Sequence, residues 1–235
     1  MATFVFVHGA WHGAWCWQPL IRELDERGHP SIAVNLPCDD VTAGLDAYAR
    51  VVVEAMGDTP ADQAVLVGHS LGGLTIPVVA SRRPVARTVF LCGLVPRPGR
   101  PFSDDYGDPD LFVPGPSERT TRDELDRSYW PEPEAAIAAL YADCDPADAL
   151  EAVSRLRPQA RRPTNDPIPI DGWPDAPSSS IVCDEDMMLS PAWVRRVTRE
   201  RLGIEPIEMA GSHSPMLSRP GELADVLARL ATSPD

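Results

Sequence analysis

The chain has 235 residues, enough for a single domain with a sizeable hydrophobic core. Its formal net charge of −14 at pH 7 disfavours binding to nucleic-acid phosphates and to anionic membrane surfaces. All of its 21 basic residues are arginines, and the absence of lysine excludes a lysine Schiff base or a lysine general base.

Short apolar runs alternate with segments of helical periodicity along most of the chain. The runs are brief enough for strands and are rich in β-branched residues; they lie at 4–7, 31–34, 64–67, 88–91, 180–183 and 204–209. Helices are predicted between and after them, at 19–27, 43–56, 71–81, 191–201 and 220–231. This alternation predicts an α/β fold with a mostly parallel sheet of about six strands and helices on both faces.

The segment 96–176 interrupts the alternation and is rich in proline, aspartate and arginine. It contains helical patterns at 132–142 and 146–156 and enough large apolar residues to pack against other parts of the molecule. We therefore expect a small, mainly helical cap over the carboxyl edge of the sheet, where open α/β sheets bind ligands. The core then comprises residues 1–95 and 177–235.

The cysteines and the N-terminus indicate a cytoplasmic protein. The five cysteines (Cys16, Cys38, Cys92, Cys144 and Cys183) are widely scattered and form no metal-binding pattern. No secretory leader precedes the first apolar run, and no stretch approaches the roughly 18 apolar residues of a membrane span. Abundant alanine, arginine and proline without lysine are typical of a GC-rich bacterial genome, and a homodimer is compatible with the sequence.

The strongest chemical signal is the motif Gly68-His69-Ser70-Leu71-Gly72, which follows the apolar run at 64–67 and precedes a helical segment. A strand, a G-x-S-x-G turn and a helix in this order are what a nucleophile elbow requires, because the tight turn needs small residues on both sides of the exposed serine. The context predicts that Ser70 is a nucleophile and that the helix after it directs N–H groups at developing negative charge.

A serine nucleophile needs a base, and the chain contains only five histidines. His213 follows the last predicted strand in a loop before the final helix, which is where this arrangement places the base. We expect the ring of His69 to pack away from the Ser70 hydroxyl, and His29 to lie at the surface. His12 fits either a core position or a contact with substrate.

The third catalytic group should be a carboxylate between the serine and the histidine in chain order. Asp184, Glu185 and Asp186 follow the predicted strand at 180–183, and three adjacent acids cannot all face one imidazole. Asp186 lies far enough past the strand to turn back toward His213 and hold its tautomer, with Asp184 as the main alternative.

Two backbone N–H groups should stabilise the oxyanion of the reaction, one after the nucleophile and one in the loop after the first strand. These are the N–H groups of Leu71 and Ala10. Gly9 allows close approach of substrate to this loop. Trp15 and Trp17 are interpreted as core anchors.

These motifs resemble the α/β-hydrolase branch that contains plant methyl esterases, hydroxynitrile lyases and bacterial esterases. The similarity covers most of the chain and rests on residues 8–15, 68–73, 183–186 and 213–217, with a lid-like stretch at 140–158. The resemblance implies a Ser70–His213–Asp186 triad, an oxyanion hole at Ala10 and Leu71, no cofactor or metal, and an apolar pocket under a lid. Trp130 is the lid residue expected near the ligand.

Two positions differ from the hydroxynitrile lyases of that group and bear on which reaction the chain catalyses. The hydroxynitrile lyases use a lysine after the catalytic histidine and a hydroxyl side chain in the first loop, whereas this chain has Ser214 and Gly9 there. The sequence therefore predicts a serine carboxylesterase or methylesterase acting on small-molecule esters. The alternatives are a lyase, cyclase or acyltransferase with the same triad, and a ligand-binding protein on the same scaffold.

Overall fold

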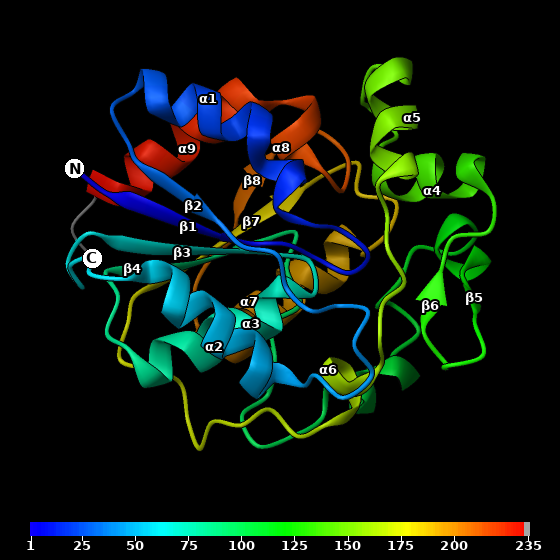
Figure 1. Cartoon of the computed structure of the whole chain (residues 1–235), viewed down its shortest axis with the longest axis horizontal. Helices are drawn as coiled ribbons and strands as arrows, with labels where there is room; N and C mark the ends of the chain where they lie inside the picture. The colour runs from blue at the N-terminus through cyan, green and yellow to red at the C-terminus, as the bar shows by residue number, and fades with distance from the viewer. Residues whose placement is uncertain (233–235) are drawn as a thin grey trace.

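The computed structural model describes residues 1–232, except for the side chains of residues 116 and 117. Its centre is a six-stranded sheet in which every neighbouring pair is parallel, in the order β2-β1-β3-β4-β7-β8 (Figure 1). The strands are β1 (Thr3–Val7), β2 (Ser31–Ala33), β3 (Ala64–His69), β4 (Arg87–Leu91), β7 (Ser178–Cys183) and β8 (Ile207–Met209). The predicted fold class is confirmed.

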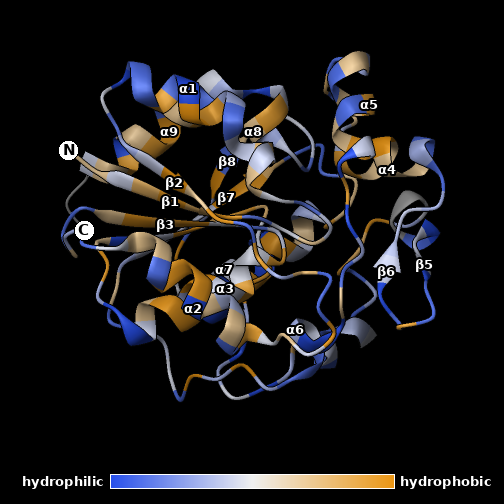
Figure 2. Ribbon diagram, in the orientation of Figure 1, coloured by the Kyte–Doolittle hydropathy of each residue, from blue (hydrophilic) through white to orange (hydrophobic). Residues whose placement is uncertain are grey.

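Alternate side chains of the strands enter two separate cores on the two faces of the sheet, because successive side chains of a strand point in opposite directions. In β1, Val5 and Val7 belong to one core, and Phe4 and Phe6 belong to the other. Figure 2 shows the apolar strands between helices whose polar sides face outward. Burial of both faces explains why the strands read as continuous apolar runs in the sequence.

Helices cover both faces of the sheet (Figure 1). One face carries α1 (Gln18–Glu26), α8 (Pro215–Ser218) and α9 (Pro220–Thr232), and the other carries α2 (Leu45–Met56), α3 (Gly72–Arg82) and α7 (Pro191–Leu202). The five predicted core helices are present with ends within two residues of the predicted ones. The last strand is shorter than predicted, since Pro206 has no N–H to donate to a neighbouring strand.

Most of the segment 96–176 lies beyond the carboxyl ends of the strands, and its last residues return along the side of the sheet to the amino end of β7 (Figure 1). It contains the 3₁₀ helices η2 (Phe102–Gly107) and η3 (Pro116–Arg119), the hairpin strands β5 (Thr121–Arg122) and β6 (Ser128–Tyr129), and the helices α4 (Pro133–Leu140), α5 (Pro146–Ser154) and α6 (Arg162–Asn165). Leu140 and Tyr141 belong to the same apolar core as β1 and α3, so this segment packs continuously with the sheet layer. Its treatment as a cap separate from a core of 1–95 and 177–235 stays a prediction.

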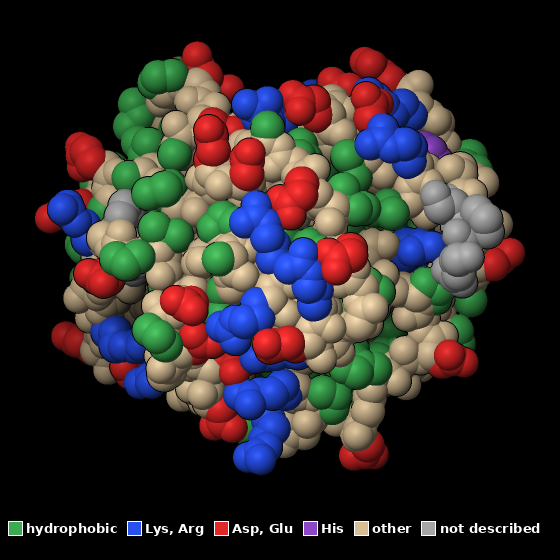
Figure 3. Space-filling model, turned by 180° about the vertical axis from the view of Figure 1, so that it is seen from behind, with side chains coloured by type: hydrophobic (Ala, Val, Ile, Leu, Met, Phe, Trp, Pro, Cys, Tyr) green, Lys and Arg blue, Asp and Glu red, His purple; other side chains and the backbone are tan. Residues whose placement is uncertain are grey.

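The surface mixes the two signs of charge. On the back of the molecule, arginine side chains form a band interspersed with acidic side chains (Figure 3). Several arginines of α7 have acidic partners, such as Arg195 with Glu208 at 2.7 Å. None of the described helices combines the length and apolar character that a membrane crossing requires. The five cysteines are free thiols, and all but Cys144 are buried.

Candidate active site

Ser70 occupies a sharp turn between β3 and α3. Its φ angle is +50°, a left-handed conformation that costs energy in a residue with a side chain. The turn has no room for larger neighbours: a Cβ on Gly68 would lie 2.7 Å from the carbonyl oxygen of Gly72, and a Cβ on Gly72 would collide with the carbonyl oxygen of Val7. The glycines of the G-x-S-x-G motif are therefore required by the backbone geometry.

Backbone hydrogen bonds fix the position of Ser70 at the end of β4. Its N–H donates to the carbonyl oxygen of Leu91 at 3.1 Å, and its carbonyl oxygen accepts from the N–H of Leu94 at 2.9 Å. Only 8% of the residue is exposed, yet it lines a pocket. The hydroxyl therefore lies on a rigid backbone and beside a space that a ligand can enter.

His213 and Asp186 form a buried hydrogen-bonded pair. His213 Nδ1 lies 2.7 Å from Asp186 Oδ2, and the two side chains are 1% and 3% exposed. The other carboxylate oxygen accepts from the backbone N–H groups of Met188 and Leu189 at 2.8 and 2.9 Å. These bonds orient the carboxylate, which in turn fixes the imidazole with a proton on Nδ1 and leaves Nε2 available as a base.

The two neighbouring acids make no such contact. Asp184 and Glu185 are exposed, and Asp184 accepts a hydrogen bond from the backbone of Gly211 at 3.2 Å. The carboxylate that reaches His213 is thus the third of the three acids, Asp186.

His69 links the nucleophile turn to the loop of His213. Its Nε2 donates to the carbonyl oxygen of His213 at 2.8 Å, and the two rings lie 4.8 Å apart. Burial holds the pKa of His69 well below its usual value, so the ring is neutral. Within the described residues no hydrogen bond joins the Ser70 hydroxyl to the His213 ring. Such contacts commonly tighten when substrate binds.

The backbone N–H groups of Ala10 and Leu71 make no hydrogen bond to the described part of the chain. Both residues line the pocket together with Ser70. Gly9 makes this arrangement possible: a Cβ there would lie 2.8 Å from Cβ of Ser70 and 2.9 Å from Nδ1 of His69. Two unused donors beside the serine match the requirement for binding an oxyanion.

The pocket measures about 600 Å³, counting its opening to solvent. Its walls come from two parts of the chain. The strand ends and the loops after them contribute Ala10, Trp11, Ser70, Leu71, Leu94, Met188 and Leu189. The segment 96–176 contributes Phe102, Tyr106, Phe112, Arg122, Ser128, Gln159, Ala160, Arg161 and Thr164.

Three residues expected to contact substrate lie outside this lining. Gly9 provides space behind Ser70, as described above. Trp130 packs edge-on against Trp11, a lining residue, with ring centroids 5.3 Å apart. His12 is 1% exposed; its Nδ1 donates to the carbonyl oxygen of Ala10 at 2.7 Å, and its Nε2 accepts from the Tyr141 hydroxyl at 2.7 Å. His12 therefore connects the first loop to the end of α4.

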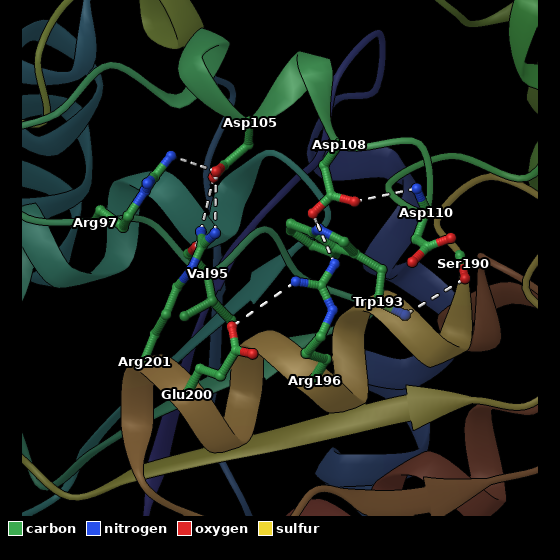
Figure 4. Close-up of polar contacts among 10 residues, drawn as sticks. All are labelled: Val95, Arg97, Asp105, Asp108, Asp110, Ser190, Trp193, Arg196, Glu200 and Arg201. Carbon is green, nitrogen blue, oxygen red and sulfur yellow. Dashed lines mark hydrogen bonds and ion pairs between the residues drawn. The ribbon is translucent and has the colours of Figure 1, made fainter.

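Ion pairs attach the aromatic wall of the pocket to α7 (Figure 4). The buried carboxylate of Asp105, in η2, accepts from Arg201 at 2.8 and 3.0 Å and from Arg97 at 2.5 Å. Arg201 also donates to the carbonyl oxygen of Val95 at 2.6 Å. Asp105 lies between the lining residues Phe102 and Tyr106, so this cluster holds that wall in place.

Sequence reasoning missed most of the lining in the segment 96–176. Gln159 and Arg161, for example, lie outside any regular element expected from the sequence. Ser128 and Gln159 exchange backbone hydrogen bonds at 2.8 and 2.9 Å. These residues lie 31 positions apart, so no local pattern in the sequence predicts their pairing. In the described part of the chain, no group of three or more His, Cys, Asp or Glu side chains could hold a metal ion.

Known proteins resemble this chain over nearly its whole length. The family model described as "Alpha/beta hydrolase family" matches residues 4–226. The probable esterase PIR7A of Oryza sativa is 30% identical over 99% of this chain and 97% of its own length. Methyl jasmonate esterase 1 of Vitis vinifera is 28% identical over 98% and 97%. The solved pyrethroid hydrolase of Sphingobium faniae superposes with a TM-score of 0.81 at 21% identity, over 99% and 98% of the two chains.

Proposed function

Because the chain belongs to the alpha/beta hydrolase family, we propose that it is a serine esterase that hydrolyses esters of small organic acids. Ser70 is the nucleophile, His213 the general base and acid, and Asp186 the group that orients His213. The observation that carries this proposal is the buried bond of 2.7 Å between His213 Nδ1 and Asp186 Oδ2, beside a pocket that Ser70 lines.

The reaction proceeds in two acyl-transfer steps. His213 Nε2 takes the proton of Ser70, and the serine oxygen attacks the ester carbonyl carbon. The tetrahedral intermediate collapses to an acyl-serine while His213 returns the proton to the leaving alcohol. Water then attacks the acyl-serine with the same base, which releases the acid and restores Ser70. The hydrogen bond from Nδ1 to Asp186 stabilises the imidazolium formed in each step.

The N–H groups of Ala10 and Leu71 stabilise the negative oxygen of both intermediates. Neither is used by another described group in the resting enzyme, so no bond has to be broken for them to act. Loss of one such donor costs about 2.7–4 kcal/mol of transition-state stabilisation in enzymes of this type.

The substrate class follows from the relatives and from the pocket. Two relatives similar over almost the full chain are named as esterases, one for methyl jasmonate. Apolar residues such as Phe102, Phe112 and Met188 form much of the pocket, as is common in small-molecule sites. A small ester with an apolar body suits this lining.

The proposal is tested with a fluorophosphonate probe and a short p-nitrophenyl ester, using the wild type and Ser70→Ala. We expect labelling and turnover in the wild type and a fall in turnover of at least about 10³-fold in the variant. Undiminished hydrolysis by Ser70→Ala would overturn the proposal.

Analysis of the reaction products in the same assays separates the alternatives. A hydrolase releases one free acid for each ester consumed, whereas a lyase, cyclase or acyltransferase does not. Labelling of Ser70 without turnover of any ester would favour one of those activities or a ligand-binding role.

Four further expectations accompany this proposal, on the partner, the compartment, the source and the oligomeric state. The partner is a small-molecule ester rather than a nucleic acid or a membrane. The free thiols suit a reducing cytoplasm, and the residue usage suits a bacterial source. Light scattering after gel filtration would decide between a monomer and a homodimer.

A further inference from the structure

The part of the pocket lining that comes from the segment 96–176 carries an excess of positive charge. Arg122 and Arg161 both line it, and its described lining residues include no acidic side chain. Both arginines pair with a single carboxylate, that of Asp126, at 3.2 and 2.9 Å. Two positive charges share one negative charge, which leaves one positive charge at the pocket of a protein whose net charge is −14.

The two guanidinium groups lie on the same side of the pocket, because both contact the carboxylate of Asp126. Tyr106, another lining residue, has its pKa raised by burial, while a hydrogen bond with Thr164 and the charges of Arg161 and Arg122 oppose the rise. Both arginines thus lie within electrostatic reach of the Tyr106 hydroxyl. The Tyr106 hydroxyl adds a potential donor on this side, whereas the Thr164 hydroxyl already donates to the carbonyl oxygen of Arg161 at 2.9 Å.

Apolar residues form much of the remaining lining of the pocket. Leu71, Leu94, Met188 and Leu189 line the pocket with Ser70, and Phe102 and Phe112 line it from the opposite segment. A ligand that fills the pocket must therefore be apolar where it passes these residues and can be negatively charged where it meets the arginines.

We propose that Arg122 and Arg161 select esters with a free carboxylate at the far end of an apolar chain, such as half-esters of dicarboxylic acids. The ester carbonyl lies at Ser70 and the free carboxylate lies at the two guanidinium groups, which present the forked donors that carboxylates prefer. This inference rests on the proposed esterase function and names its substrate class.

The test compares two substrates of the same shape in a series of straight-chain dicarboxylic acids. One is the monomethyl ester with a free carboxylate, and the other is the same methyl ester with a primary amide at the far end. At low salt we expect kcat/KM to be about tenfold higher for the carboxylate at the best chain length. This preference should decrease as salt is added, because the arginines are 47% and 43% exposed and remain open to screening.

The variants assign the preference to the two arginines. The double variant Arg122→Gln/Arg161→Gln should remove the preference, so that kcat/KM for the carboxylate falls to the value for the amide in the same variant. Asp126→Asn, which keeps both arginines and removes their shared partner, should increase the preference. Arg119→Gln is the matched control, since Arg119 is exposed and paired with Glu132 but does not line the pocket.

Equal kcat/KM for the two substrates at low salt would overturn the inference, as would a preference that survives in the double variant. Either result leaves the esterase function intact if both substrates are hydrolysed and Ser70→Ala is inactive. Failure to hydrolyse any ester would count against the esterase function itself.

Discussion

The two walls of the pocket differ in the contacts that hold them in place. The wall that carries Ser70, Ala10 and Leu71 is built from strand ends and fixed by backbone hydrogen bonds and by the absence of space for a Cβ. The opposite wall, from η2 to α6, consists of short elements joined to the rest by a few backbone hydrogen bonds, such as that from Ala160 to Cys38, and by side-chain contacts such as that of Asp105 with Arg201. A backbone-built wall keeps its geometry when surface side chains change, and a wall held partly by side chains can change its specificity without altering the chemistry.

The largest expected effect comes from the backbone-built wall. Asp186→Asn should lower kcat by about 10⁴-fold, because an amide can stabilise the wrong tautomer of His213 and cannot stabilise its charged form. Steady-state kinetics with a p-nitrophenyl ester would measure the effect.

Asp184→Asn is the control for that substitution. Asp184 lies two residues away and is exposed, and among the described hydrogen bonds its carboxylate accepts only from the backbone N–H of Gly211. The kcat of the variant should therefore stay within about threefold of the wild type. Equal losses in the two variants would mean that general acidity of the loop, and not the bond to His213, supports turnover.

A smaller effect, on the free energy of unfolding, is expected from a substitution that weakens the wall from η2 to α6. Arg201→Gln leaves the buried Asp105 carboxylate with Arg97, whose side chain is 46% exposed, and removes the donor to the carbonyl of Val95. The free energy of unfolding should fall by about 3 kcal/mol, since a buried charge loses its buried partner. Urea unfolding would measure it.

Arg199→Gln provides the matched control on the same helix. Arg199 and Glu205 are 52% and 74% exposed, so this substitution should cost less than about 0.5 kcal/mol. Labelling of Ser70 by the fluorophosphonate should persist in Arg201→Gln. Lost labelling in folded Arg201→Gln would show that the two walls are not independent.

The same difference explains what the sequence could predict. The strands, the core helices and the elbow at Ser70 follow local patterns, because apolar runs, periodicity and glycine spacing are set by neighbours in the chain. The pairing of Ser128 with Gln159 depends on contacts between distant segments, and so does the placement of Arg122 and Arg161 in the pocket. The expectation that Trp130 and His12 contact substrate rested only on composition and on the family resemblance, and neither residue lines the pocket.

His12 connects the two walls through its hydrogen bonds with Ala10 and Tyr141. Its ionisation has the smallest expected effect, which is on the pH dependence of stability. Burial lowers the pKa of His12 to about 4, against 6.5 for an exposed histidine. Its Nε2 accepts from Tyr141, a bond that a protonated ring cannot keep. Between pH 6.5 and 4 the unfolded chain therefore binds a proton at this position that the folded chain does not, so stability falls as the pH falls through this window and is unaffected by this group above it.

We expect His12→Gln to reduce this pH dependence, because glutamine can accept from Tyr141 and does not titrate. One proton corresponds to a slope of about 1.4 kcal/mol per pH unit, so urea unfolding between pH 6 and 4.5 should show a slope smaller by up to that amount in the variant. If wild type and His12→Gln have the same slope, His12 already carries its proton in the folded protein, and the bond from Tyr141 does not join the two walls.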